Sequence, residues 1–202
     1  MKNIAILLIL FITSCKAQTI VSLSTATSWD YGHNNYVQDT DGVLNPFLGT
    51  WRWTDTSTNS EFTVVFIKKE MHNPENMNDY KEDIIMGGYK YIHNGVLIID
   101  CTVFTTSFNS AIPSSFTNYA PILSNISAPF ESLSLNLSDK IKGKACHGSF
   151  DFINPEPHPS GGIFSNQARW KIWDREHWTV NGVNPLPVGF SIPTDVILTK
   201  IY

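Results

Sequence analysis

From about residue 36 onward, the chain alternates short runs of β-branched and aromatic residues with clusters of Asn, Asp, Gly, Pro and Ser. In several of these runs apolar residues take every second position, most strictly in residues 133–137, where Leu alternates with Ser and Asn. No long window repeats apolar residues every 3.6 positions, as an amphipathic helix would. A period of two is that of a strand with one buried face, so the pattern predicts an all-β domain.

The runs and their short connections predict about eight strands in antiparallel order. The expected strands lie in residues 47–54, 61–69, 83–92, 96–104, 133–137, 141–152, 167–173 and 195–202. Residues 105–131 and 154–166 are rich in proline and are expected to form long loops. Eight antiparallel strands close naturally into a barrel without exposed edges. We therefore predict a lipocalin-like β-barrel, with a β-sandwich of the same strands as the alternative.

One connection can be predicted in detail. Asn94-Gly95 is a strong hairpin signal, because both residues tolerate a positive φ. A two-residue turn at this point would place Ile92 opposite Leu97 and Tyr91 opposite Ile98.

The N-terminal residues follow a different pattern, in which a basic residue precedes an unbroken apolar run over residues 4–12. The run matches the core of a signal peptide and falls short of the roughly 20 residues of a membrane-spanning helix. It ends in Ile12-Thr13-Ser14-Cys15, which resembles the lipobox of bacterial lipoproteins. The resemblance implies cleavage before Cys15 and lipid on its thiol, and two or three acyl chains anchor a protein stably. The alternative is an ordinary secretory signal and a soluble protein that begins at Gln18.

These patterns divide the chain into three parts. Residues 1–14 are the expected signal peptide, residues 15–34 a lipidated N-terminus and tether, and residues 35–202 a single β-barrel domain. The tether is predicted because this segment is rich in Ser, Thr and Asn and shows little periodicity. Lys16-Ala17-Gln18 brings no acidic run after the cysteine, and its resemblance to lipoprotein sorting signals implies the outer membrane, facing the periplasm.

Charge and motif content narrow the expected partners. The formal net charge is −4, whereas nucleic-acid binding needs a basic footprint, so nucleic acid is not an expected partner. The membrane is expected to be reached through the lipid on Cys15, since the chain has no polybasic patch for head groups. No C-x-x-C, H-E-x-x-H or phosphate-binding glycine loop is present, so neither a metal nor a cofactor is predicted.

Cys101 and Cys146 both fall within expected strands. In an oxidising compartment they would be able to pair as a disulfide. A buried thiol within a strand is the alternative. Pairing requires the two Cα atoms to lie within about 7 Å, which sequence does not reveal, so both alternatives stay open.

The segment Asn45-Pro46-Phe47-Leu48-Gly49-Thr50-Trp51-Arg52-Trp53 opens the first expected strand. It resembles the G-x-W strand of lipocalins and fatty-acid-binding proteins, which implies that Trp51 plugs the closed end of a barrel. Lipocalins also pack a basic side chain of the last strand across this tryptophan, and Lys200 is the candidate here. The two helices that fatty-acid-binding proteins insert after this strand have no room in this chain, so a lipid-binding role is not carried over.

A wider pattern gives a second resemblance. Residues 36–42 precede the G-x-W strand, and residues 88–92, Asn94-Gly95 and residues 193–201 follow it. Together with the Met-Lys-Asn start and Cys15-Lys16-Ala17-Gln18, this pattern resembles an uncharacterised family of small exported lipoproteins of Bacteroidetes. The resemblance covers most of the chain and supports fold and location, but that family has no assigned activity.

Two functions follow as hypotheses. The first is a binding protein that holds a small apolar or amphipathic ligand in the mouth of the barrel. Trp53, Tyr89, Tyr91 and Trp173 are the candidate ligand-binding residues, since aromatic rings supply large apolar contact surfaces. The second is a structural or interaction lipoprotein whose long loops bind another envelope protein or a glycan.

A catalytic site is not predicted. His147, Ser149 and Asp151 share one face of an expected strand. Alternate residues on a strand face are about 6.6 Å apart, whereas a nucleophile and its base must come within about 3 Å. A polar, outward-facing strand surface explains the three residues better, so the chain is not expected to be an enzyme.

Overall fold

The computed structural model describes residues 18–31, 34–73, 80–103, 122–126, 128–157, 162–174 and 188–201. Its strands are β1 (Thr19–Ser22), β2 (Asn35–Gln38), β3 (Gly49–Asp55), β4 (Ser60–His72), β5 (Tyr80–His93), β6 (Val96–Asp100), β7 (Ile122–Ile126), β8 (Ser132–Asp139), β9 (Lys144–Phe152), β10 (Glu156–Pro157), β11 (Ile163–Phe164), β12 (Gln167–Asp174) and β13 (Asp195–Ile201). A short 3-10 helix, η1 (Asn45–Phe47), precedes β3. Among the described residues, no helix has the length and apolar character to cross a membrane.

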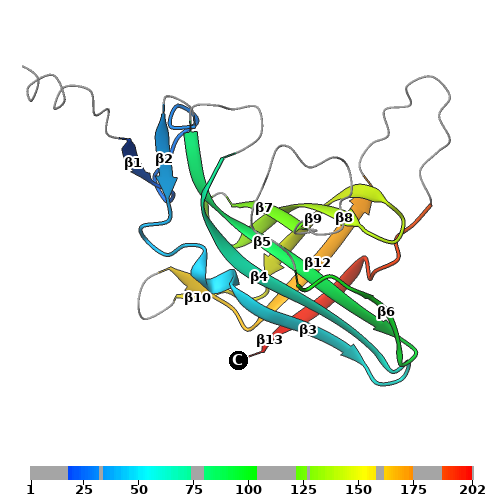
Figure 1. Cartoon of the computed structure of the whole chain (residues 1–202). Helices are drawn as coiled ribbons and strands as arrows, with labels where there is room; N and C mark the ends of the chain where they lie inside the picture. Colours follow the sequence, from blue (N-terminus) through cyan, green and yellow to red (C-terminus); the bar gives the residue numbers. More distant parts are fainter. Residues whose placement is uncertain are drawn as a thin grey trace, which may run out of the picture.

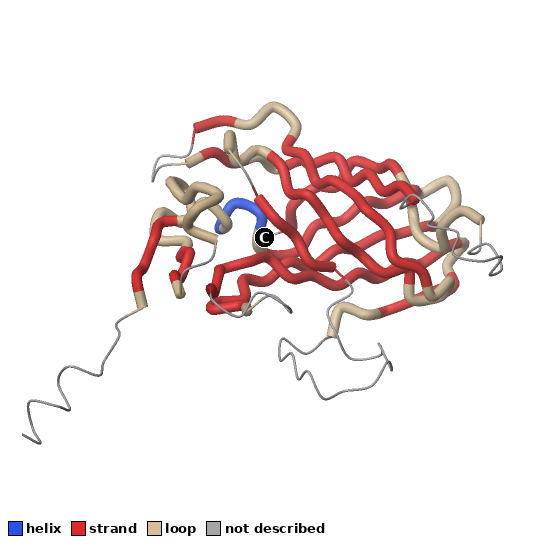
Figure 2. Tube along the Cα trace, turned by 90° about the horizontal axis from the view of Figure 1, so that it is seen from above, coloured by secondary structure: helices blue, strands red, loops and turns tan. Residues whose placement is uncertain are grey.

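Eight of the strands form a closed antiparallel barrel (Figure 1). In chain order, β3, β4, β5, β7, β8, β9, β12 and β13 each pair with the next, and β13 pairs back with β3. Figure 2 shows the strands wrapped around a common interior, with η1 beside the C-terminal end of the chain. The predicted all-β, lipocalin-like barrel is therefore confirmed, and the sandwich alternative is not the fold.

Strand β5 joins the barrel to the segments that extend it. One edge of β5 pairs with β4. The other edge pairs in turn with β2 near Tyr80, with β7 near Met86 and with β6 near Tyr91. β1 pairs with β2, and β2 pairs with β5, both in parallel. The N-terminal segment therefore continues the sheet beyond the barrel ring.

The folded part of the chain begins before residue 35, the boundary expected from composition. Strand β1 and the buried Leu23 lie within the segment expected to be a tether. Strand β7 lies within residues 105–131, which were expected to form a loop. These elements are short, and β1 and β2 join the sheet through parallel pairing, in which no tight turn connects the two strands, so the local pattern gives a weak signal for them.

The hairpin between β5 and β6 has the predicted turn. Both residues of Asn94-Gly95 have a positive φ, 51° and 76°. Ile92 pairs with Leu97 as predicted, but Tyr91 pairs with Ile99, one position further than expected. The register shifts between these two pairs because of a β-bulge, which sets one extra residue into one strand.

Large aromatic side chains fill much of the interior of the barrel. The fully buried rings are Phe47, Trp51, Phe62, Phe66, Tyr89, Phe150 and Trp170. The ring centroid of Phe150 lies 4.8 Å from that of Trp51 and 5.1 Å from that of Phe66, both edge to face. A Cβ at Gly87 would lie 2.7 Å from the Phe66 ring, so this glycine makes room for it. Side chains therefore occupy the space between the strands here.

Trp51 lies at the end of the barrel that η1 covers. Its indole nitrogen donates a hydrogen bond to the carbonyl of Phe47 at 2.8 Å. Lys200, from the last strand, places its ammonium nitrogen 5.2 Å from the Trp51 ring centroid and donates to the carbonyl of Pro46 at 2.6 Å. Burial lowers the pKa of this lysine. The basic side chain that the lipocalin resemblance implies is thus in place across the tryptophan.

Candidate functional site

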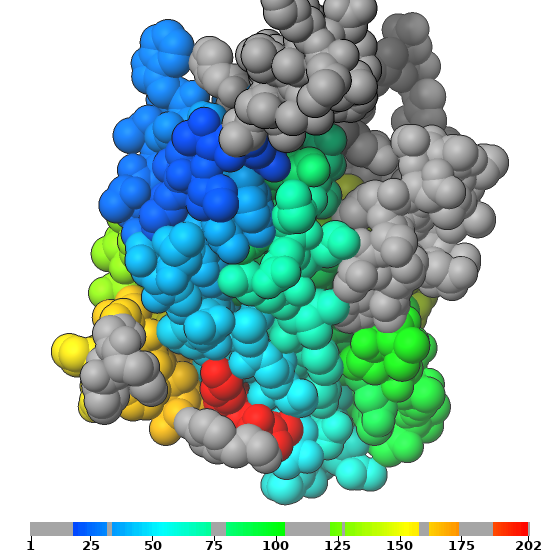
Figure 3. Space-filling model, turned by 60° about the vertical axis from the view of Figure 1, so that its left-hand side comes forward, coloured from blue at the N-terminus to red at the C-terminus, as the bar shows by residue number. Residues whose placement is uncertain are grey.

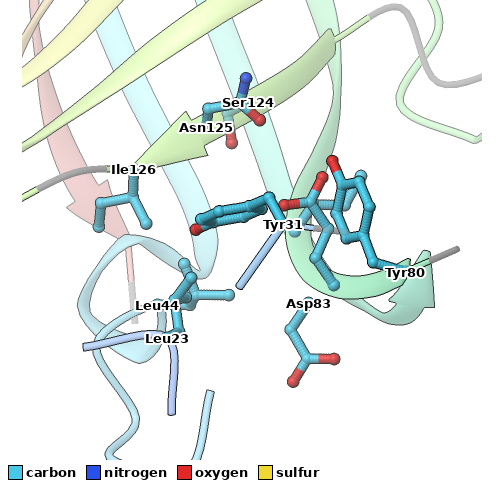
Figure 4. Close-up of a pocket in the computed structure, with 10 residues that line it drawn as sticks. Leu23, Tyr31, Leu44, Tyr80, Asp83, Ser124, Asn125 and Ile126 are labelled. Carbon is cyan, nitrogen blue, oxygen red and sulfur yellow. The ribbon is translucent and has the colours of Figure 1, made fainter. Parts of the chain in front are cut away.

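A pocket of about 270 Å³ lies where the N-terminal segment meets β5 and β7 (Figure 4). Its apolar walls come from Leu23, Leu44, Ile84 and Ile126. Figure 3 shows this side of the molecule, where the N-terminal residues, in blue, lie against segments coloured cyan and teal. The walls come from distant parts of the sequence, so the pocket depends on tertiary structure.

A buried ionic network next to the pocket fixes the N-terminal segment to the barrel. The Lys68 ammonium nitrogen lies 3.2 Å from a carboxylate oxygen of Asp39 and 3.4 Å from one of Asp83, and both carboxylates are fully buried. Burial alone would lower the pKa of Lys68, but the two carboxylates more than offset it and raise this pKa. The hydroxyl of Tyr36, on β2, donates to Asp83 at 2.6 Å. Burial, together with this hydrogen bond, raises the pKa of Tyr36 far above its usual value.

Asp39 also fixes the backbone of the segment that contributes Leu44 to the pocket wall. Its carboxylate accepts hydrogen bonds from the backbone amides of Val43 at 2.7 Å and Leu44 at 3.4 Å. These bonds hold the turn that leads into η1, and Leu44 is 1% exposed. The same carboxylate therefore anchors Lys68 and sets the position of an apolar wall residue.

Tyr31 and Tyr80 form an aromatic corner of the pocket. Their ring centroids are 5.6 Å apart and their planes meet at 87°. Burial raises the pKa of Tyr80 to about 12 and also raises that of Tyr31. Both hydroxyl groups therefore stay protonated at physiological pH and remain able to donate hydrogen bonds.

Glu82 brings an unusual carboxyl group to the same pocket. Burial raises its pKa to about 7. The neighbouring Asp83, in contrast, accepts hydrogen bonds from the backbone amides of Asp39 at 3.0 Å and Met71 at 3.2 Å. Among the described residues no comparable donor offsets the partial burial of Glu82, so this group exchanges its proton near neutral pH. It is suited to accept a hydrogen bond from a ligand or to pair with a cation.

Replacing Glu82 with glutamine is expected to stabilise the protein above pH 7 and to change its stability little below pH 4. The native pKa of about 7 exceeds the ordinary 4.5, so the folded state binds more protons between these values and stability falls as the pH rises through them. Discounted for partial exposure, the gain at pH 8 is about 1–2 kcal/mol, or roughly 2–6 °C in Tm. Thermal unfolding at pH 4 and pH 8 measures it.

A control is needed because His72 pairs with Glu82 across β4 and β5 and histidine titrates in the same range. The comparison is therefore repeated in a His72→Gln background, where Glu82→Gln should give a similar gain. Equal stability of the two proteins at pH 8 would contradict the prediction.

The four aromatic residues predicted to bind a ligand do not all face the same side of the sheet. Tyr89 is fully buried, and its hydroxyl donates to the carbonyl of Ser138 at 2.7 Å. Tyr91 is half-buried on the same face of β5, whereas Trp173 points outward from β12 and is 45% exposed. Trp53 lines a separate groove between β3 and β13. The alternation of side chains along the strands places Trp173 on the outer surface, whereas Trp53 and Tyr91 are partly buried and pack against the core that contains Tyr89.

Of the two alternatives left open for the cysteines, the structure has the free thiols. Cys101 and Cys146 form no disulfide. The sulfur of Cys101 lies 3.2 Å from the carbonyl oxygen of Tyr89, and that of Cys146 lies 3.6 Å from the carbonyl oxygen of Leu137. Burial raises the pKa of Cys101, which keeps it as a thiol. Cys15, the predicted site of lipidation, lies outside the described residues.

The outward face of β9 carries the polar residues considered for catalysis. His147, Ser149 and Asp151 alternate with buried positions, and Ser149 donates its hydroxyl to Asp151 at 2.6 Å. Within the part of the chain that the structure describes, no group of three or more His, Cys, Asp or Glu side chains is placed to hold a metal ion. The arrangement of the three residues is that of a polar strand surface.

Sequence reasoning missed the residues that build the pocket. Tyr31 lies in the segment assigned to the tether, and Tyr80 and Glu82 precede the expected start of their strand. The sequence did contain a signal for β1 and β2, since Ile20-Val21 and Tyr36-Val37 are short runs of strand-forming residues in an otherwise polar region. Their pairing with each other and with β5 could not be read from either run alone.

The fold and its site define a class, that of closed eight-stranded antiparallel barrels with an N-terminal extension. A family model matches residues 1–201, and the chain belongs to that family, the family of unknown function DUF6705. No curated protein and no solved structure matches the chain. The match spans the barrel and the N-terminal segment that forms the pocket, and it carries no assigned activity.

Proposed function

We propose that the protein is a lipid-anchored lipoprotein of the bacterial cell envelope that binds a small amphipathic molecule in the pocket beside its barrel. The observation that carries this proposal is the composition of the pocket, in which apolar and aromatic walls surround the partly buried carboxyl group of Glu82. Sites for small molecules combine mostly apolar surface with a few convergent polar groups. Because rings fill the barrel interior, the proposed binding place is this pocket and not the barrel mouth.

The pocket also has the rigidity that a binding site needs. The ionic network of Lys68, Asp39 and Asp83 fixes one side of it, and the barrel strands form the other. A site that is already ordered loses less conformational entropy when a ligand binds, which favours affinity. These features support binding of a molecule that fits the existing shape.

The proposed anchor is the lipid on Cys15, supported by the lipobox-like sequence Ile12-Thr13-Ser14-Cys15. Strand β1 begins at Thr19, so the chain between the anchor and the first strand spans at most roughly 15 Å. Such a short connection would hold the barrel close to the bilayer surface. The outer membrane, with the barrel facing the periplasm, is the proposed location.

Native mass spectrometry of the full-length protein, extracted from membranes in detergent, tests both parts of the proposal. We expect a chain that begins at Cys15 with two or three acyl chains attached, together with a bound small molecule that collisional activation releases. A chain that begins at Gln18 without lipid would contradict the anchor. Repeated absence of any bound molecule would count against ligand binding.

Two variants provide the controls. Cys15→Ala should abolish incorporation of labelled palmitate, whereas Cys101→Ala should leave it unchanged. Ile126→Trp places a large ring at the pocket wall and should reduce the fraction of protein that carries the bound molecule. Full occupancy in the Ile126→Trp protein would place the ligand elsewhere.

A further inference from the structure

We infer that the pocket selects a small organic cation, a molecule with a primary or quaternary ammonium group. This inference rests on the proposed function and deepens it by naming the class of ligand. It depends on three features of the pocket: the charges that line it, the geometry of its aromatic corner and the size of its apolar part.

The charges of the lining favour a cation. Glu82 and Asp83 both line the pocket, and among the described residues around it no lysine or arginine does so. Asp83 is already matched, since Lys68 lies 3.4 Å from its carboxylate and the Tyr36 hydroxyl donates to it. For Glu82 the described part of the chain provides neither an ion pair nor a hydrogen-bond donor, and a positive charge in the pocket would stabilise its ionised form. An anionic ligand, such as a fatty acid, would meet two carboxylates.

The aromatic corner favours the same charge. Tyr31 and Tyr80 stand nearly perpendicular, with their centroids 5.6 Å apart, so they offer two walls at right angles (Figure 4). The face of an aromatic ring carries negative electrostatic potential and attracts cations, and quaternary ammonium groups are bound in this way by cages of aromatic rings. Glu82 acts electrostatically on both tyrosines, so the carboxylate and the rings belong to one site.

The remaining walls and the size of the pocket limit the ligand to a small molecule. Leu23, Leu44 and Ile126 provide apolar surface that suits the methyl or methylene groups around an ammonium nitrogen. The volume of about 270 Å³ lies below the roughly 300–1,000 Å³ of sites for drug-sized ligands. A hydrated metal ion would leave these apolar walls unmatched, whereas an organic cation covers them.

Calorimetric titration with matched probes tests the inference. Choline carries a trimethylammonium group, and 3,3-dimethyl-1-butanol has the same shape with a carbon atom in place of the nitrogen. At pH 8, above the pKa of Glu82, we expect the full-length protein in detergent to bind choline roughly tenfold or more tightly than the neutral alcohol. Glu82→Gln should remove this preference, and Glu131→Gln, at an exposed position outside the pocket, should keep it.

The outcomes separate the inference from the proposed function. Equal or tighter binding of the neutral alcohol would overturn the cation class and leave small-molecule binding intact. Failure of both probes, alongside a co-purified neutral or anionic molecule, would overturn the inference alone, and failure of both with no co-purified molecule would overturn the proposed function as well. A preference for choline that survives Glu82→Gln would also contradict the assigned site.

A third probe distinguishes a free ammonium compound from a lipid head group. Glycerophosphocholine adds a phosphate, which would lie near Glu82 and Asp83 with no basic side chain in the described lining to offset it. We therefore expect it to bind more weakly than choline. Tighter binding of glycerophosphocholine would support the ammonium chemistry and assign its source to lipid.

Discussion

Replacing Asp83 with alanine is expected to lower the free energy of unfolding by about 3–5 kcal/mol, because buried hydrogen-bond donors would lose their acceptor and Lys68 would lose one of its two carboxylate partners. The carboxylate accepts hydrogen bonds from the Tyr36 hydroxyl and from the backbone amides of Asp39 and Met71. The Lys68 nitrogen lies 3.4 Å from it, and the carboxylate is fully buried. Urea unfolding at pH 7 measures the loss.

Asp195→Ala is the matched control, since it removes an ion pair at the surface. Asp195 faces Arg169 at 2.6 Å, but both side chains are exposed. Exposed pairs of this kind contribute about 0–1 kcal/mol, so Asp195→Ala should lower the free energy of unfolding far less than Asp83→Ala does. The double variant Asp83→Ala/Lys68→Met should lose less than the sum of its two single variants, because each single variant already loses the contact between Lys68 and Asp83. A loss below about 1 kcal/mol for Asp83→Ala would contradict the network's role.

Trp51→Ala is expected to destabilise the protein by about 3–5 kcal/mol, because it opens a cavity in the packed end of the barrel. The side chain is fully buried and packs edge to face on Phe150 at a centroid distance of 4.8 Å. Its indole nitrogen donates to the carbonyl of Phe47, and the Lys200 ammonium lies above its ring. The variant therefore loses ring packing, a hydrogen bond and a cation–π contact together.

Two further tryptophan variants separate these contributions. Trp51→Phe keeps a ring but removes the hydrogen bond to Phe47. Its free energy of unfolding should lie between those of the wild type and Trp51→Ala. Trp173→Ala removes a ring that is 45% exposed and should stay within about 0.5 kcal/mol of the wild type. Denaturation followed by circular dichroism compares the three proteins, and equal losses for Trp51→Ala and Trp173→Ala would contradict the assigned core.

Several strands could be predicted because their residues carry the pattern locally. In β8, buried and open positions alternate along the strand in step with Leu133, Leu135 and Leu137. β12 behaves in the same way, with Trp170 buried and Trp173 exposed. The barrel followed from the number of such strands and their short connections, since eight antiparallel strands close without leaving an edge.

The candidate site could not be predicted, because it depends on pairings between distant segments. Tyr31 contacts Tyr80 because β1 pairs with β2 and β2 pairs with β5. No residue near Tyr31 in the chain indicates that contact. Parallel pairing of short strands leaves no turn signal in the sequence, unlike Asn94-Gly95, which indicates its hairpin directly. Strand periodicity tells which residues share a face, but it does not tell which faces meet.

The all-β class, the strand faces, the β5–β6 turn and the position of Trp51 in the first barrel strand follow from local sequence, because they depend on alternation, turn residues and a short motif. The sequence also carries the basis for the proposed anchor at Cys15. Only the three-dimensional fold fills the interior with rings, joins the N-terminal segment to the sheet and places Glu82, partly buried, in one pocket with two tyrosines. Burial of a charged group and the shape of a pocket arise from surfaces that meet across the fold, and no local pattern encodes them.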